Sequence, residues 1–324
     1  MKLKAIATIA AVTPLMVACG SGSDNTTFRL DAAGATFPAT LYQAWFTRYS
    51  QATGNRVNYQ AVGSGAGVRQ YNAQTIDFGA SDAAVKDSKI PEGGMVQIPM
   101  TGGAIVPAYN NKGCEAKMTQ TQLADVFMGK ITNWSEFGCE DKNILVVHRS
   151  DGSGTTKGFT NSLAAFSPEW KEKLGTAKSV KWPVGVGAKG NSGVAAQVIQ
   201  QDGAIGYMNY DYSKNPKLTQ VKLQNKAGNY VTANAETSAA GLSKIVLDDK
   251  LRGTDANPAG ANAYPIVSLT WILAYPESRT GVKDMLRYML SEESQALSDS
   301  LGFVPLPENL RQKSLAAVET ISEI

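Results

Sequence analysis

The stretch HRSDGSGTTKGFTNSLA, residues 148–164, gathers hydrogen-bonding side chains and glycines at one point of the chain. Arg149, Ser153 and Thr155 stand among the glycines, and the residues that follow turn apolar at helical spacing. The segment therefore predicts a helix whose first turn is rich in hydrogen-bond donors. A helix start has backbone N–H groups without intrahelical partners and a partial positive charge, so it can hold an anion. The competing chemistry is nucleophilic attack by a hydroxyl group.

Three other segments repeat this design, because each ends an expected strand, turns at glycine and continues with small or hydroxyl residues. They are GATFP at 34–38, GSGAG at 63–67 and GASD at 79–82. Glycine lets the backbone approach a ligand closely, while Ser or Thr adds a hydroxyl donor. Arg149 can add a bidentate, charge-assisted contact. Together the four segments predict a cradle for a tetrahedral oxyanion, although one segment alone is typical of an ordinary N-cap or turn.

A hydrolase is the alternative of a different class. Ser153 could be a nucleophile with His148 as its base, but they lie five residues apart and no G-x-S-x-G elbow is present. The chain has one histidine and no H-E-x-x-H or Cys/His cluster for a phosphatase metal centre. GSGTTKG also lacks the spacing of a P-loop. We therefore expect no enzyme activity, no metal and no cofactor, and we expect His148 to be a half-exposed neighbour without a role.

The elements that must position these residues alternate between strands and helices with short loops, which is typical of an α/β fold. The apolar residues Trp45, Phe127 and Trp134 are expected in the core. Residues 213–262 are polar and poor in aromatics, which predicts surface strands and a connection. Residues 280–302 predict one amphipathic helix that ends at a glycine followed by two prolines.

The first residues predict export. Residues 1–18 contain two lysines and then an apolar run, which is typical of a signal peptide and too short to span a membrane as a stable helix. The run ends in Val-Ala-Cys19, which resembles a bacterial lipoprotein lipobox; an ordinary signal peptide with a chance cysteine is the alternative. Residues 19–27 would then be a lipidated N-terminus and a polar tether, and lipid on Cys19 would hold the protein at a membrane.

Charge and cysteine count bound the mature chain. Removing residues 1–18 takes away two lysines, so the 31 basic side chains become 29 against 28 acidic ones. This balance argues against bulk capture of nucleic acid or of an anionic membrane face. Cys114 and Cys139 remain, and an even pair in an exported chain predicts a disulfide. It would close a loop of roughly 25 residues and stabilise the fold by about 3 kcal/mol.

Seven motifs, in this order and spacing, resemble the phosphate-binding protein of bacterial high-affinity phosphate ABC transporters: AGATFP, VGSGAGVRQ, DFGASDA, GKITNW, RSDGSGTTKGFT, VKWPVGVGAKGNSGVAAQV and GAIGYMNY. The resemblance covers nearly all of the mature chain. It implies a type II periplasmic-binding-protein fold, in which two α/β lobes, each a mixed sheet flanked by helices, are joined by crossing strands around a ligand cleft. The first lobe would hold residues 26–105 plus 262–324, and the second lobe residues 106–261.

The same resemblance implies the residues that bind inorganic phosphate. They are Thr36, Phe37, Ser64, Asp82, Arg149, Ser153, Gly154 and Thr155. Those of the first lobe would donate N–H and hydroxyl groups, except Asp82, which would accept a hydrogen bond. Those of the second lobe would supply a guanidinium, a hydroxyl and helix-start donors, and Asp151 would orient Arg149 without touching the ligand. The family can carry a second basic residue before Arg149, where this chain has His148.

The function implied is that of an extracytoplasmic solute-binding protein, periplasmic or at the cell surface, which is monomeric and delivers phosphate to the permease of an ABC transporter. Within the same fold, arsenate, sulfate or molybdate is the alternative ligand. A surface adhesin or structural lipoprotein is a further alternative, but it would leave the donor-rich helix starts unexplained.

Asp82 bears on the choice among the oxyanions. Phosphate keeps at least one proton at neutral pH, while sulfate has none, so a buried carboxylate can accept a hydrogen bond only from phosphate. A site built around a ligand's hydrogen bond can reject an analogue lacking it by ~10⁴–10⁵. We therefore expect discrimination against sulfate but little against arsenate, which is also protonated. The alternative role of Asp82 is the N-cap of a following short helix.

Overall fold

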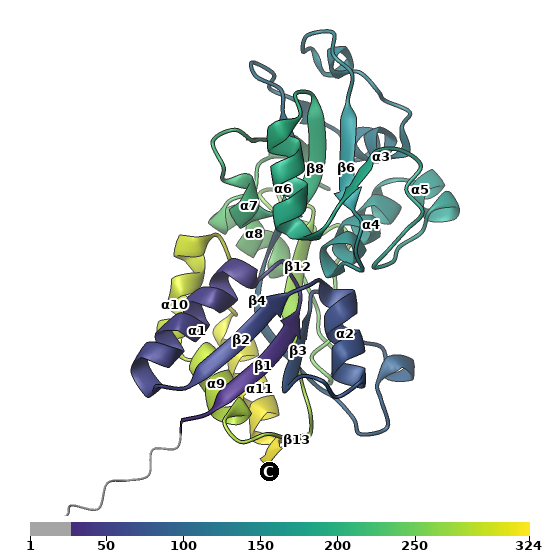
Figure 1. Cartoon of the computed structure of the whole chain (residues 1–324). Coiled ribbons are helices and arrows are strands. Elements are labelled where there is room, and N and C mark those ends of the chain that lie inside the picture. The colour runs from purple at the N-terminus through teal and green to yellow at the C-terminus, as the bar shows by residue number, and fades with distance from the viewer. Residues whose placement is uncertain (1–26) are drawn as a thin grey trace, which may run out of the picture.

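The computed structural model describes residues 27–324 (Figure 1), so the predicted signal peptide and Cys19 lie outside the described residues. The strands are β1 (Arg29–Gly34), β2 (Arg56–Ala61), β3 (Phe78–Ser81), β4 (Val96–Asn110), β5 (Lys117–Met118), β6 (Leu145–Arg149), β7 (Val186–Ala188), β8 (Ala204–Asn209), β9 (Thr219–Gln220), β10 (Lys222–Gln224), β11 (Tyr230–Val231), β12 (Val267–Ala274), β13 (Glu277–Ser278) and β14 (Ser322–Glu323). The helices are α1 (Ala39–Thr53), α2 (Ser64–Asn72), α3 (Gln120–Met128), α4 (Gly154–Phe166), α5 (Pro168–Lys173), α6 (Gly190–Gln200), α7 (Tyr210–Ser213), α8 (Ala235–Leu242), α9 (Val282–Met289), α10 (Glu292–Leu301) and α11 (Glu308–Glu319). Two short 3₁₀ turns cover Asp87–Lys89 and Trp134–Phe137. The predicted alternation of strands and helices is confirmed.

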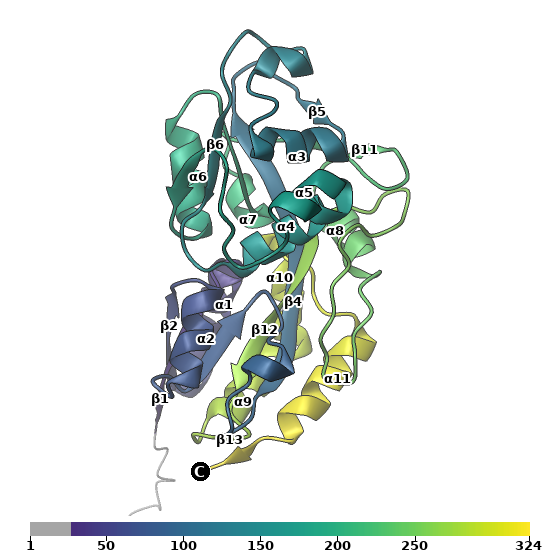
Figure 2. The same ribbon diagram turned by 90° about the vertical axis from the view of Figure 1, so that its right-hand side faces the viewer.

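One mixed sheet runs through both halves of the molecule, in the order β2-β1-β3-β12-β4-β8-β6-β7 (Figures 1 and 2). The long strand β4 joins the halves because it changes partner along its length. Its first part pairs with β12 up to Ala104, and its second part pairs with β8 from Ile105 onward, both antiparallel. Most of β4 is buried, which explains why most of its fifteen residues are apolar or small.

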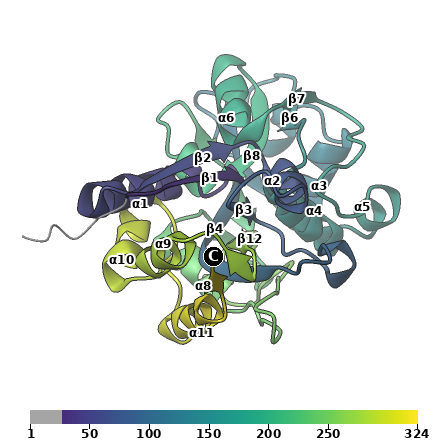
Figure 3. The same ribbon diagram turned by 60° about the horizontal axis from the view of Figure 1, so that its bottom comes forward.

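Helices cover both halves of the sheet, which are called here the lower half, with β1, β2, β3 and β12, and the upper half, with β6, β7 and β8. In the lower half, α2 packs on β1 and β3, while α1 packs on β2 and has α9 and α10 beside it (Figure 3). In the upper half, α6 packs on β6 and β8. Trp45, Phe127 and Trp134 are fully buried, so the prediction that they belong to the core is confirmed. Among residues 27–324, no helix has both the length and the apolar character that crossing a bilayer requires.

Helices begin just after the carboxyl ends of parallel strands in both halves, and these ends face one another at the middle of the molecule (Figure 1). In the lower half, β1 leads to α1 and β2 leads to α2. In the upper half, β6 leads to α4 and β7 leads to α6. Ligands of open α/β sheets bind at the carboxyl ends of strands, so this meeting point is where a site is expected.

The C-terminal region differs from the sequence prediction. The single helix expected at 280–302 is wrong, because α9 ends at Met289 and α10 begins at Glu292. Between them, Ser291 accepts the N–H of Ser294 at 3.2 Å and so caps a new helix. Apolar spacing runs through both helices, which is why periodicity alone merged them. The sequence prediction also left out α8, within the segment expected to hold surface strands, and α11.

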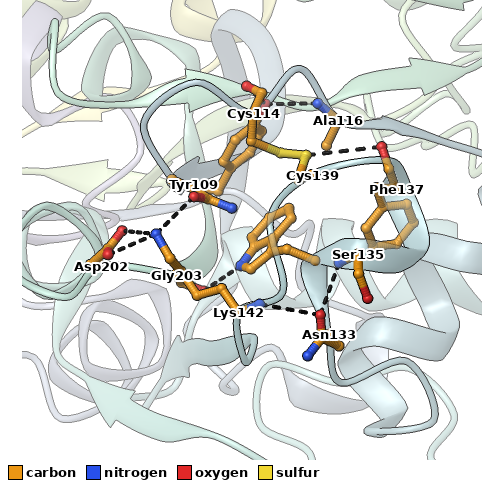
Figure 4. The surroundings of a disulfide bond; sticks show 12 residues. Tyr109, Cys114, Ala116, Asn133, Ser135, Phe137, Cys139, Lys142, Asp202 and Gly203 are labelled. Carbon is orange, nitrogen blue, oxygen red and sulfur yellow. Dashed lines mark hydrogen bonds and ion pairs between the residues drawn. A yellow bond between two sulfur atoms is a disulfide. The ribbon is translucent and has the colours of Figure 1, made fainter.

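The predicted disulfide between Cys114 and Cys139 is present, and the two cysteines are separated by 25 residues. It ties the loop after β4 to the 3₁₀ turn that contains Trp134 (Figure 4). The hydroxyl of Tyr109 accepts the N–H of Ala116 and donates to the carbonyl oxygen of Cys114, both at 2.9 Å. These contacts fasten the loop to the core of the upper half.

Reduction of this disulfide should lower the free energy of unfolding by about 3 kcal/mol, because it restores the loop's freedom in the unfolded chain. Urea unfolding of the oxidised and the reduced protein measures the difference. The double variant Cys114→Ser/Cys139→Ser is the control, since its stability should not respond to reductant. Identical unfolding curves for oxidised and reduced protein would contradict the prediction.

Candidate anion-binding site

The glycine-rich segments singled out in the sequence meet where the two halves of the molecule touch. A Cβ atom placed on Gly154 would lie 2.6 Å from Ser64 Oγ and 2.8 Å from the backbone nitrogen of Asp82. The N–H of Gly65 donates to the carbonyl oxygen of Gly152 at 2.7 Å. Since these residues come from opposite halves, the structure is a closed form in which only a glycine fits at position 154.

Arg149, at the end of β6, is almost completely buried beside Asp151. Its Nε and Nη2 groups donate to the two carboxylate oxygens of Asp151 at 2.7 and 2.6 Å, and Nη1 donates to Thr155 Oγ1 at 3.3 Å. Burial raises the pKa of Asp151, but the Arg149 guanidinium and the N–H of Gly190 outweigh it, so this pKa lies below its ordinary value. The guanidinium is thus fixed by a carboxylate two residues away.

The start of α4 follows directly. Ser153 is its N-cap, and the Ser153 hydroxyl accepts the N–H of Thr156 at 2.9 Å. This contact uses the lone pairs of the hydroxyl and leaves its proton available for donation. The backbone N–H of Ser153 itself donates to the carbonyl oxygen of Lys178 at 2.8 Å. The residues of the opening motif therefore do form a donor-rich helix start.

Thr36 of the lower half meets Asn191 at the start of α6. The hydroxyl oxygen of Thr36 accepts the backbone N–H of Asn191 at 3.2 Å and its side-chain Nδ2 at 2.9 Å. The same Nδ2 donates to Thr155 Oγ1 at 3.1 Å, so Asn191 links both halves. Asn191 lies within one of the seven sequence motifs, but no role for it was predicted from the sequence. Asn191 follows a glycine at the start of a helix, as several predicted site residues do, so the same pattern could have identified it.

Phe37 follows Thr36 and has a fully buried ring. The ring packs edge-on against Phe303, with 6.1 Å between the centroids. The backbone carbonyl oxygen of Phe37 accepts a long hydrogen bond from Asn209 Nδ2 at 3.4 Å. The side chain of Phe37 therefore serves the core, and only its backbone can serve the site.

Asp82 lies directly after β3 and is buried among hydroxyl groups. Thr270 Oγ1 donates to Oδ1 at 2.9 Å, and Ser64 Oγ donates to Oδ2 at 3.3 Å. Burial raises the pKa of Asp82 to about 6, although the Thr270 hydroxyl, the charges of Arg149 and Lys178 and the Ser64 hydroxyl all oppose the rise. The carboxylate is therefore ionised at neutral pH and close to protonation.

The alternative role of Asp82 as an N-cap is wrong, because the next helical turn begins at Asp87 with Lys86 as its cap. Thr270 donates a hydrogen bond to Asp82, but no role for Thr270 was predicted from the sequence. It lies within the apolar strand β12, and no local pattern marks one threonine of a buried strand as functional.

His148 does not face Ser153 as a base faces a nucleophile. Its ring stacks on Trp182 with 5.0 Å between the centroids, and Nδ1 lies 3.2 Å from the carbonyl oxygen of Arg149. Burial lowers the pKa of His148, so the ring is neutral at pH 7. In the described part of the chain, no three His, Cys, Asp or Glu side chains gather as metal ligands.

Comparisons with known proteins define the family. A family model described as PBP superfamily domain matches residues 20–293. The phosphate-binding protein PstS of Pasteurella multocida is 40% identical over 319 residues, which cover 90% of each chain. The phosphate-binding protein PstS of Haemophilus influenzae is 38% identical over 299 residues, which cover 87% of this chain and 90% of that protein.

Solved structures agree in fold. The phosphate binding protein from Stenotrophomonas maltophilia superposes with a TM-score of 0.70 at 21% identity, over 89% of this chain and 93% of that chain. An ABC-type phosphate transport receptor from Vibrio cholerae gives a TM-score of 0.59 at 18% identity, over 86% of this chain and 100% of that chain. The chain therefore belongs to the PBP superfamily and, within it, to the family of the PstS phosphate-binding proteins. Its fold is the type II periplasmic-binding-protein fold that the sequence predicted.

Replacing Asp151 by leucine should destabilise the protein by about 3 kcal/mol, because it leaves the buried Arg149 charge without a partner. The double variant Arg149→Met/Asp151→Leu should recover most of the loss, since it removes both charges. Urea unfolding without added anion measures both variants. Glu115→Gln, at an exposed ion pair with Lys222, is the control and should change little. Equal losses in the single and double variants would contradict the prediction.

Proposed function

We propose that this chain is an extracytoplasmic solute-binding protein that captures inorganic phosphate between its two halves and delivers it to an ABC permease. The observation that carries the proposal is the buried Asp82 carboxylate, which lies against the donor-rich starts of α2 and α4. The helix starts can donate hydrogen bonds to the oxygens of an anion, and the Asp82 carboxylate can accept one from an anion that still carries a proton. Membership of the PstS family supports the same ligand.

We further propose the two lobes that the sequence predicted, residues 26–105 plus 262–324 and residues 106–261. The change of partner along β4, from β12 to β8 between Ala104 and Ile105, supports the first boundary. The second boundary has support from β12, which begins at Val267 and returns the chain to the lower half. Phosphate would stabilise the closed form only through its higher affinity for that form than for the open one.

The proposed ligand contacts are those predicted from the sequence. They are the N–H groups of Thr36 and Phe37 with the Thr36 hydroxyl, the N–H and hydroxyl of Ser64, the Asp82 carboxylate as acceptor, the Arg149 guanidinium, the Ser153 hydroxyl, and the helix-start donors of Gly154 and Thr155. Their gathering at the closed interface supports this set. The Arg149 pair with Asp151 supports an orienting role for Asp151.

The remaining properties belong to the same proposal. The protein would be monomeric, would lie in the periplasm or at the cell surface, and would be anchored through lipid on Cys19. It would bind no nucleic acid, need no cofactor or metal, and catalyse no reaction. The names of its relatives, which are binding and transport proteins, support a binding role over a hydrolase.

Calorimetric titration of phosphate-free protein with phosphate, arsenate, sulfate and molybdate tests the ligand. We expect tight binding of phosphate, measurable binding of arsenate, and little heat from the other two anions. Incubation with a phosphate monoester tests the alternative, and we expect no released phosphate. Sulfate or molybdate binding as tightly as phosphate, or turnover of the ester, would overturn the proposal.

The Asp82→Asn variant should reduce the preference for phosphate over sulfate by at least about 100-fold, because the amide can donate to an unprotonated oxygen. Competition calorimetry of both anions measures the ratio. Asp249→Asn, at an exposed aspartate, is the matched control and should leave the preference intact. An unchanged ratio in Asp82→Asn would remove the proposed role of this carboxylate.

Sulfate binding by the unchanged protein should depend on pH through Asp82. Its pKa is raised to about 6, so the carboxyl group is protonated below that pH and can then donate to sulfate. Sulfate affinity should therefore rise about tenfold per unit as the pH falls from 8 towards 6, and level off below 6. Titrations between pH 5 and 8 measure this, and Asp82→Asn should give a flat profile. A flat profile in the unchanged protein would contradict the assignment.

A further inference from the structure

Lys178 lies between α5 and β7 and contacts both halves of the closed molecule. Its Nζ group donates to the Ser81 hydroxyl in the lower half at 3.1 Å, directly before Asp82. Its carbonyl oxygen accepts the N–H of Ser153, the cap of α4, at 2.8 Å. One lysine thus contacts the neighbour of the proposed acceptor and the helix start opposite it.

The Lys178 side chain is partly buried at this contact. An ammonium has three donors, and within residues 27–324 the hydrogen bond that Nζ makes is to the neutral Ser81 hydroxyl and not to a carboxylate. Ser81 is neutral, and its own hydroxyl donates to the carbonyl oxygen of Ala83 at 2.6 Å. Burial lowers the pKa of Lys178 to about 8, which the negative charge of Asp82 opposes. A partly buried cation that contacts the other half of the molecule without a carboxylate partner of its own indicates a role beyond packing.

The charges around Asp82 indicate what that task is. Arg149 acts on Asp82 from β6, but both of its bidentate donors are taken by Asp151, whose charge offsets its own. Tyr42, Tyr59 and Tyr212 also lie near enough to Asp82 to feel its charge. Burial raises the pKa of each of these tyrosines, so they stay neutral. Among the groups that act on Asp82, Lys178 is the cation whose charge no ion pair within residues 27–324 offsets.

We propose that Lys178 is a positioning residue for anion recognition, which latches the halves together through Ser81 and keeps Asp82 ionised as a hydrogen-bond acceptor. The inference rests on the proposed function and names a further determinant of its specificity. Lys178 lets the site keep a carboxylate charged beside an anion, which is the condition for excluding sulfate.

The Lys178→Met variant tests the charge. Loss of the ammonium should raise the pKa of Asp82, which the charge of Lys178 lowers, and we expect a rise of about one unit, the low end of the range for a nearby opposite charge. The plateau of sulfate binding should therefore begin near pH 7 instead of 6. Phosphate affinity should also fall, because the contact between Nζ and the Ser81 hydroxyl is lost. Lys178→Arg should restore the unchanged profile. Lys181→Met, an exposed lysine of the same loop, is the matched control.

The Ser81→Ala variant separates the latch from the charge. It removes the hydroxyl that Nζ contacts but keeps the lysine and its charge. Phosphate affinity should therefore fall, while sulfate affinity should still level off near pH 6. Circular dichroism melting shows whether each variant is folded. If Lys178→Met does not fold, Ser81→Ala and Lys178→Arg still test the proposal.

An unshifted sulfate profile in folded Lys178→Met would overturn the inference, as would failure of Lys178→Arg to restore the profile. If instead the unchanged protein binds no phosphate, the proposed function itself has failed.

Discussion

The proposed site depends on keeping one buried carboxylate ionised next to the anion that it would bind. Removing Asp82 from water disfavours its charge strongly, and a bound anion would disfavour it further. The groups that oppose this come from separate parts of the chain, namely Ser64 at the start of α2, Thr270 on β12, Arg149 on β6 and Lys178 in the loop before β7. Two of them belong to each half, so the charge of Asp82 and the closure of the molecule depend on each other.

The other constraint on the proposed site is that the charge of its arginine is balanced before any ligand arrives. Arg149 is neutralised by Asp151, and the helix starts contribute partial charges and N–H groups without whole charges. A site of this kind recognises an anion by the number and direction of its hydrogen bonds, because net attraction is small. The tight approach of Gly154 to Ser64 has the same consequence, since it allows little freedom in the closed arrangement.

The features that depend on residues close together in the chain were predicted correctly from the sequence. The strand and glycine turn before Ser153, the helix start that follows and the buried Trp45 were all predicted from local spacing and were found in the structure. The prediction failed where a local pattern has two solutions. Residues 280–302 keep a helical period throughout, yet Ser291 caps a second helix, because a capping hydroxyl competes with continuation and only the neighbouring packing decides between them.

By itself, then, the sequence determined the α/β class, the donor-rich helix starts, the cysteine pair and the acidic residue at the end of a strand, since each depends on residue types at short spacing. Only the tertiary structure decided which groups surround Asp82. Thr270 reaches it because β12 runs antiparallel to β3 with Trp271 opposite Ser81, and Lys178 reaches Ser81 across 97 positions of chain. Contacts at that separation are set by sheet register and by how the two halves close, which no local pattern specifies.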